Sequence, residues 1–180
     1  GAHSTVRKTL GLGFAGERYP ETWSLADVRM DWRFGHGEGN LFMGDCGGVV
    51  FVIALPEDRY RVIANAPDVL SLLPSGSNVT EVLWQTDFTV SLRQVDAYGK
   101  GRAFLAGDAA HIHTPAGGRG MNLGIEDACE FSERLSLGTL DGYSEERHRV
   151  GRQVIKESDL QFRMASIGNP VLKILRNSVL

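Results

Sequence analysis

The stretch GRAFLAGDAAHIHTPAGGRGMNLGIED spans Gly101–Asp127 and carries the strongest structural signal in the chain. Its short apolar run, Ala103–Ala106, ends in Gly107-Asp108, a glycine-rich loop follows, and a helix is predicted from Met121. The pattern predicts a strand with a carboxylate at its tip, then backbone N–H groups that point into the start of a helix. A carboxylate accepts hydrogen bonds from hydroxyls, and a helix N-terminus offers unpaired N–H groups with a partial positive charge. The stretch therefore favours a ligand with sugar hydroxyls at one end and electron-rich carbonyls at the other.

These residues closely resemble the second flavin-binding motif, the GD motif, of the FAD-dependent aromatic hydroxylases, the group typified by para-hydroxybenzoate and phenol hydroxylase. The match keeps its spacing at Gly107, Asp108, Ala109, Ala110, His111, Pro115, Gly117, Gly118, Gly120 and Asn122. A second resemblance lies in Gly1–Arg7, GAHSTVR, which is similar to the family's DG motif, D-G-x-x-S-x-x-R, without its Asp. The resemblance covers essentially the whole chain.

The resembled family carries an N-terminal βαβ unit whose G-x-G-x-x-G loop holds the ADP half of FAD. No such unit precedes Gly1, and the chain lacks an initiator Met, so we expect a fragment of a longer flavoenzyme. The letters GLGFAG at residues 11–16 fit the glycine pattern. However, Thr5–Thr9 makes a poor buried strand, and Pro20 falls where the helix would need its first turns. We therefore expect a glycine-rich connector at residues 11–16.

The resemblance implies a set of cofactor-binding residues: Arg7, Gly107, Asp108, Ala109, Pro115, Gly117, Gly118, Gly120, Met121 and Asn122. In this scheme Asp108 accepts hydrogen bonds from the ribityl hydroxyls of FAD, and the glycines let the backbone approach a flat ligand. The amides of Gly120–Asn122 lie near the pyrimidine carbonyl, where reduced flavin carries negative charge. The carbonyl of Pro115 lies near substrate and flavin, and Arg7, with Ser4, helps to close the FAD site.

Some of these residues also suit plainer roles. Asp108 could cap its own loop, Pro115 could form a simple turn, and Arg119 is either a solvated cation or a partner of anionic flavin or NADPH. His111 and His113 lie near Asp108 and together offer three metal ligands, but no further Cys or His lies nearby. Because a zinc site needs a closed ligand set with supporting partners, we expect no metal.

Composition narrows the class of protein. Hydrophobic residues make up 42% and charged residues 23% of the 180, values typical of a globular protein, and the net charge is −3. A net negative chain without a long apolar run does not favour nucleic-acid or membrane binding. The two cysteines, Cys46 and Cys129, form no disulfide framework, and free thiols favour a cytoplasmic setting. Basic residues in Arg147–Lys156 interleave with acids and predict a solvated helix face.

Alternation over Trp23–Trp32 predicts a half-buried strand, with its apolar face on Ala26, Val28, Met30 and Trp32. Further strands are expected over Leu41–Met43, Val49–Leu55, Tyr60–Ala64, Val79–Leu92 and Arg102–Ala106. Helices are expected over Ala66–Leu73 with Asn65 as its cap, over Met121–Leu135, over Tyr143–Ser166 and from Asn169-Pro170 onward.

These elements indicate an α+β fold, in which an antiparallel substrate-domain sheet is joined to the strand–loop–helix that completes the FAD site. The whole would belong to a mixed α/β FAD/NAD(P)-binding fold. We expect residues 1–10 to be the remnant of the DG-motif segment, and residues 11–100 to form the substrate-binding sheet domain. Residues 101–180 would then be the second part of the FAD-binding domain, with its C-terminal helices.

The resemblance implies an FAD-dependent monooxygenase that uses NAD(P)H and hydroxylates a small aromatic substrate through a flavin hydroperoxide. No Ser-His-Asp or Cys-His set stands out, which fits chemistry carried by a cofactor. Two alternatives stay open: another flavin reaction on the same scaffold, such as that of a halogenase or a prenyl-chain reductase, or a folded, non-catalytic fragment that binds no flavin. We expect no useful monooxygenase activity from the fragment alone, and association of copies through exposed apolar surface.

Overall fold

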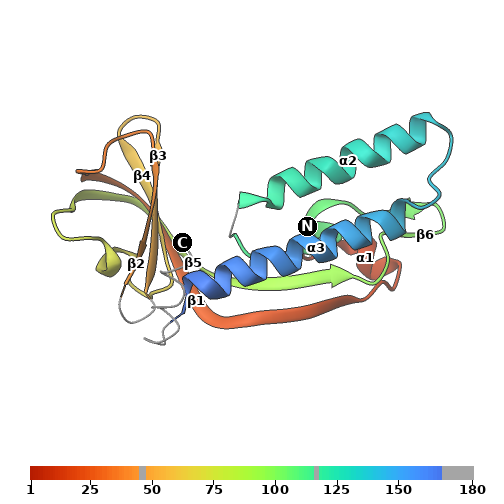
Figure 1. Cartoon of the computed structure of the whole chain (residues 1–180), viewed down its shortest axis with the longest axis horizontal. Coiled ribbons are helices and arrows are strands. Elements are labelled where there is room, and N and C mark those ends of the chain that lie inside the picture. The colour runs from red at the N-terminus through yellow and green to blue at the C-terminus, as the bar shows by residue number, and fades with distance from the viewer. Residues whose placement is uncertain (45–47, 116–117, 168–180) are drawn as a thin grey trace. The chain divides into compact units, whose positions relative to one another are not determined.

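The computed structural model describes residues 1–44, 48–115 and 118–167 (Figure 1). The chain forms two compact units. The first comprises Gly1–Arg18 and Ser91–Phe162, and the second comprises Tyr19–Val90 and the chain from Arg163 onward. Two long strands, β1 (Phe14–Asp31) and β5 (Asn78–Val95), contribute residues to both units. The domain boundaries expected at residues 10 and 100 stay a prediction.

The second unit is built on an antiparallel sheet, which confirms the expected α+β class. Beside β1 and β5 it contains β2 (Gly39–Met43), β3 (Val49–Leu55) and β4 (Arg59–Ala64). The strand order of the whole sheet is β2-β3-β4-β1-β5-β8, where β8 is His111–Ile112. The bounds of β2, β3 and β4 agree closely with the predicted strands, because alternating or continuous β-branched runs are a strong local signal, whereas β1 begins well before the expected Trp23.

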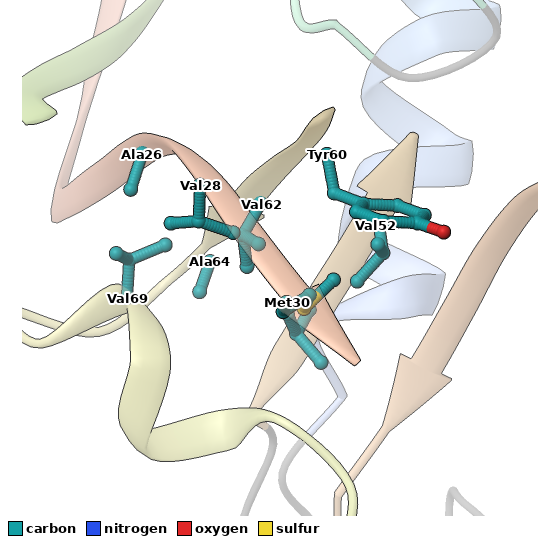
Figure 2. Packing of buried hydrophobic residues seen from close by; sticks show 9 residues of the cluster. Ala26, Val28, Met30, Val52, Tyr60, Val62, Ala64 and Val69 are labelled. Carbon is teal, nitrogen blue, oxygen red and sulfur yellow. The ribbon is translucent and has the colours of Figure 1, made fainter. Parts of the chain in front are cut away.

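One face of this sheet forms the core of the second unit (Figure 2). The register pairs Val28 with Tyr60, and Val62 with both Ala26 and Val52, so the buried members of three strands lie in one layer. Figure 2 shows Val69 facing this layer from the segment that follows β4. Full burial of a valine stabilises a fold by about 1.5–3 kcal/mol, so this layer is the main support of the unit.

The helix expected over Ala66–Leu73 is wrong in extent and in cap. The structure has only a 3₁₀ turn, η1 (Val69–Leu72), and Asp68 caps it by accepting the N–H of Leu70 at 3.1 Å. Pro67 disfavours helical backbone at the residue before it, which delays the turn. Asn65 instead accepts the N–H of Val49 at 2.6 Å and ties the end of β4 to the start of β3.

The first unit contains the helices and the short elements around the glycine-rich loop. In chain order they are α1 (Thr5–Thr9), β6 (Gly99–Lys100), β7 (Ala103–Phe104), η2 (Gly107–Ala109), β8, α2 (Gly120–Ser136) and α3 (Tyr143–Ala165). Figure 1 shows α2 and α3 as two long helices side by side. Tyr98 and Tyr143 are buried at the centre of this unit, with Leu105 and Ala110 packed around them. The two long helices confirm the predicted spans.

Two predictions about this unit need correction. The strand expected over Arg102–Ala106 is only β7, because its partner β6 offers just the pairs Gly99↔Phe104 and Lys100↔Ala103. The connector expected at residues 11–16 ends early, since Phe14 already begins β1. Thr5–Thr9 is a short helix, which agrees with rejecting a βαβ unit there. The helix expected from Asn169 lies outside the described residues.

None of the helices in the described ranges combines the length and apolar character that a membrane-spanning helix needs.

Candidate cofactor site

The Gly107-Asp108-Ala109 triplet forms the 3₁₀ turn η2, which we call the GD turn. Gly107 has φ +56°, a left-handed conformation that favours glycine. Ala110 closes the turn by donating its N–H to the carbonyl of Gly107 at 2.8 Å. A Cβ atom on Gly124 would lie 3.4 Å from the Cα of Gly107, so α2 packs backbone to backbone against the turn. The glycines at both positions therefore bring the helix and the turn together.

Asp108 is exposed in the middle of the GD turn. The residue that caps η2 is Ala106, with no side-chain hydrogen bond, and the Asp108 carboxylate accepts no hydrogen bond within the part of the chain that the structure describes. The loop-capping alternative is therefore not what the structure shows. A carboxylate without a protein donor is free to accept hydrogen bonds from ligand hydroxyls.

Arg7 joins the N-terminal motif to the GD turn. Its guanidinium donates from Nη1 to the carbonyl of Ala109 at 2.9 Å, 102 residues away in sequence, and from Nη2 to the carbonyl of Ala2 at 2.6 Å. The same group stacks over the ring of Phe14, with 3.8 Å from Cζ to the ring centroid. Ser4 caps α1 by accepting the backbone N–H of Arg7 at 3.2 Å. The structure thus brings Arg7, Gly107, Asp108 and Ala109 to one place.

The N-terminus of α2 follows the glycine-rich loop. Its cap residue, Arg119, makes no capping hydrogen bond, and the first turn has no acidic side chain. Met121, 76% exposed, and Asn122 lie at the surface of this turn. The Arg119 side chain pairs with Glu157 of α3 at 2.8 Å, so in this structure it is an exposed ion-pair partner. An uncapped helix start offers N–H groups and partial positive charge to an electron-rich ligand atom.

The loop before α2 contains the remaining predicted residues. Gly118 has φ +60°, a left-handed backbone that favours glycine, although nothing lies within 4 Å of its Cβ position. Gly118 donates its N–H to the carbonyl of Pro115 at 3.0 Å, so the turn role of Pro115 is present in the structure. A Cβ on Gly120 would make only an ordinary 3.7 Å contact with the His113 ring. Gly117 lies outside the described residues.

A buried ion cluster supports the GD turn from behind, and sequence reasoning did not assign it a role. We call His111, Asp127 and Arg147 the Asp127 cluster; their exposed fractions are 1%, 0% and 6%. One oxygen of Asp127, Oδ2, accepts the N–H of Gly107 at 2.9 Å and Nε2–H of His111 at 2.8 Å. The other, Oδ1, accepts Nε–H of Arg147 at 2.6 Å.

The charges of the Asp127 cluster are balanced inside the fold. Burial alone would raise the pKa of Asp127, but the hydrogen bonds from His111, Gly107 and Arg147 outweigh it and hold the pKa below its usual range. The carboxylate therefore stays ionised and pairs with the Arg147 guanidinium. The expectation of a solvated helix face over residues 147–156 is wrong for Arg147, which is buried and paired.

The two histidines of the loop have structural partners. His111 donates to Asp127, and His113 donates from Nδ1 to the carbonyl of Thr114 at 2.9 Å. Burial lowers the pKa of His113, so its ring is neutral at neutral pH, while its buried Nε2 atom has no hydrogen-bond partner in the described part of the chain. Among residues 1–44, 48–115 and 118–167 no group of three or more His, Cys, Asp or Glu is arranged to hold a metal ion.

A sequence signal for the Asp127 cluster did exist. Leu123 and Asp127 are four residues apart and so lie on the same face of α2, and both are buried. Tyr143, Arg147 and Gly151 repeat the spacing on α3, again all buried. A charged residue on the apolar stripe of each of two consecutive helices predicts a buried pair, because a buried charge needs a partner.

Taken together, the GD turn, the glycine-rich loop and the start of α2 offer one acceptor for hydroxyls and a row of backbone donors. An acceptor at Asp108 and donors at Gly120–Asn122 have the chemistry to receive the two parts of a flavin, the ribityl hydroxyls and the pyrimidine carbonyl. The Asp108 carboxylate, which accepts no hydrogen bond from residues 1–44, 48–115 or 118–167, is the group that such a ligand would satisfy.

Comparison with known proteins identifies the family of the chain. A family model described as FAD binding domain matches residues 66–158, more than half of the chain. The uncharacterized aromatic compound monooxygenase YhjG of Bacillus subtilis is 32% identical over 91% of this chain and 38% of its own length. Pentachlorophenol 4-monooxygenase of Sphingobium chlorophenolicum is 35% identical over 87% of this chain and 34% of its own length. The chain thus spans between a third and two fifths of these relatives.

The chain is also similar to a solved structure, p-nitrophenol 4-monooxygenase PnpA from Pseudomonas putida, with a TM-score of 0.86 and 26% sequence identity. The match covers 99% of this chain and 52% of the PnpA chain. The sequence match and the structural match therefore point the same way, and this chain belongs to the FAD binding domain family.

Proposed function

We propose that this chain forms the ribityl- and isoalloxazine-binding part of the FAD site of a monooxygenase that hydroxylates a small aromatic substrate, with NAD(P)H as reductant. The observation that carries the proposal is the exposed Asp108 carboxylate, which has no hydrogen-bond donor among the described residues, on a turn packed against the uncapped start of α2. The names of the relatives support the reaction, since two of them are a pentachlorophenol and a p-nitrophenol 4-monooxygenase.

Bound FAD would supply the redox and oxygen chemistry, as cofactors do in such enzymes. The residues of this chain would bind and orient it. Asp108 would accept hydrogen bonds from ribityl hydroxyls, and the first-turn amides of α2 would stabilise negative charge on the pyrimidine ring. Arg7 would hold the carbonyl of Ala109, and so the turn, in place.

The substrate contacts are proposed to lie on the sheet of the second unit, whose strands carry aromatic side chains. Trp32, directly after β1, contacts both Phe42 and Tyr60, with ring centroids 5.9 Å apart for Trp32 and Phe42 and 6.1 Å apart for Trp32 and Tyr60. Such clusters are also common in plain cores, so no single residue is assigned to substrate. The relatives reported above are named monooxygenases, which favours this reaction over halogenation or prenyl-chain reduction.

The test is a titration of the 180-residue chain with FAD, followed by flavin fluorescence. We expect saturable binding that Asp108→Asn weakens at least about tenfold, because a hydrogen bond to a charged group contributes about 1.5–3 kcal/mol. Asp141→Asn is the matched control: Asp141 is an exposed carboxylate of the same unit, and among the described residues only its backbone is engaged, the carbonyl by Arg134 and the N–H by Thr139. Equal affinities of the Asp108 and Asp141 variants would refute the assigned role of Asp108.

A further inference from the structure

We propose that Asp127 is a positioning residue, which fixes the GD turn in the conformation that presents Asp108 to the flavin. This inference rests on the proposed function, because the turn is taken to be part of an FAD site. It assigns a role to a side chain that never reaches the ligand: Asp127 is fully buried and acts through the backbone of Gly107.

The GD turn is attached to the rest of the first unit on three sides. Gly107 donates its N–H to Asp127 at 2.9 Å, Ala109 accepts from Arg7 at 2.9 Å, and the carbonyl of Ala110, directly after the turn, accepts the N–H of Val95 at 2.8 Å. The residue between the first two attachments is Asp108, which has no attachment of its own among the described residues. The direction of its side chain is therefore set by the groups that hold its neighbours.

Of these three hydrogen bonds, the one from Gly107 has the acceptor whose position is held by the most other contacts. Gly107 has a left-handed backbone and no side chain, so only backbone contacts hold it, among them its N–H to Asp127 and its close approach to Gly124. Its N–H meets an oxygen that is also bound by His111, while Arg147 of α3 binds the other oxygen of the same carboxylate. Asp127 cannot rotate toward another partner without breaking a buried, charge-assisted hydrogen bond.

The geometry thus links the turn to both long helices. Asp127 comes from α2 and Arg147 from α3, and the Arg147 Nη2 atom lies 3.7 Å from Glu126, the neighbour of Asp127. The second contact between the turn and α2 is the close approach of Gly107 and Gly124, on the turn of helix before Asp127. A ligand that binds at Asp108 would therefore meet a turn that the fold already holds in one conformation. The loss of conformational entropy on binding is then smaller.

The experiment compares Asp127→Asn with a control variant that removes a different ion pair between the same two helices. Arg134 of α2 also bridges to α3, by pairing with Glu130 of its own helix and Glu146 of α3, but it does not contact the GD turn. Arg134→Gln therefore removes an α2–α3 ion pair without touching Gly107. The two readouts are hydrogen exchange at the Gly107 amide in the ligand-free chain, with the Val154 amide of α3 as reference, and FAD affinity.

We expect Asp127→Asn to speed exchange at Gly107 at least about tenfold relative to Val154, and to weaken FAD binding by a similar factor. Arg134→Gln should leave the ratio of the two exchange rates, and the FAD affinity, within about twofold of the parent chain. If Asp127→Asn does not fold, the double variant Asp127→Asn/Arg147→Gln, which removes both buried charges, takes its place with the same expected result.

Equal acceleration at Gly107 and Val154 would overturn the proposal, because it would show general loosening of the fold. Unchanged exchange at Gly107 would overturn it as well. If the parent chain binds no FAD while Gly107 is released selectively, the positioning role stands and the proposed function fails. The exchange measurement therefore separates the two claims.

Discussion

At the scale of single residues, the candidate site was readable from the sequence where the residues form a spaced motif. Gly107, Asp108 and Gly118 lie in turns, as the spacing of the motif predicts. Gly107 and Gly118 adopt a left-handed backbone, and Asp108 is exposed between neighbours that hydrogen bonds hold in place. Asp127 was not found, because its signal is a buried spacing repeated on two separate helices, α2 and α3, and not a short motif. Long-range pairing of buried charges is decided by packing, which a short motif does not contain.

The pH dependence of stability tests the Asp127 cluster at this scale. The pKa of Asp127 is lowered in the fold, because its hydrogen bonds outweigh the effect of burial. A carboxyl with a lowered pKa stabilises the folded chain above its ordinary pKa, 3.8, and this contribution is lost as the pH falls through the folded value. We therefore expect the free energy of unfolding to fall less steeply below about pH 4 in Asp127→Asn than in the parent chain. Urea unfolding at several pH values measures this slope, and an unchanged slope would contradict the ionised, buried carboxylate.

At the scale of elements, long helices and regular strands were predicted well, and short elements were not. α2 and α3 have helical periodicity over many residues, whereas β7 has two residues and depends on an equally short partner. The early start of β1 was missed because its first residues are exposed on both faces and carry no alternation. Element ends are set by neighbours across the sheet, which a local window does not include.

Gly16 provides the sharpest prediction at the element scale. It lies in β1 with φ +146°, and a Cβ atom there would be 1.9 Å from the carbonyl oxygen of Leu92 in β5. We expect Gly16→Ala to lower the free energy of unfolding by about 3 kcal/mol or more, because backbone rather than a flexible side chain blocks the methyl group.

Gly11→Ala is the control for this prediction. Gly11 also has a left-handed backbone, φ +66°, but nothing lies within 4 Å of its Cβ position. The substitution should cost only about 1 kcal/mol of backbone strain. Equal losses for the two variants in urea unfolding would show that the close approach of β1 and β5 does not limit the residue at position 16.

At the scale of the whole molecule, the resemblance of the two motifs predicted the family that the comparisons establish. The fold class also followed from the order of elements, an antiparallel sheet followed by helices. Identification of the substrate did not follow, because aromatic residues on strands build cores as readily as ligand walls. The proposed contribution of the chain is a flavin half-site, made by α2, the GD turn and Arg7 within one compact unit.

The most direct test of this account is a competition experiment on the 180-residue chain with bound FAD, using riboflavin and ADP as competitors. Riboflavin carries the ring and the ribityl chain, whereas ADP carries only the other half of the cofactor. The account predicts that riboflavin displaces FAD, that ADP does not, and that Asp108→Asn weakens both flavins alike. Displacement by ADP but not by riboflavin, or the absence of saturable binding of either flavin, would contradict it.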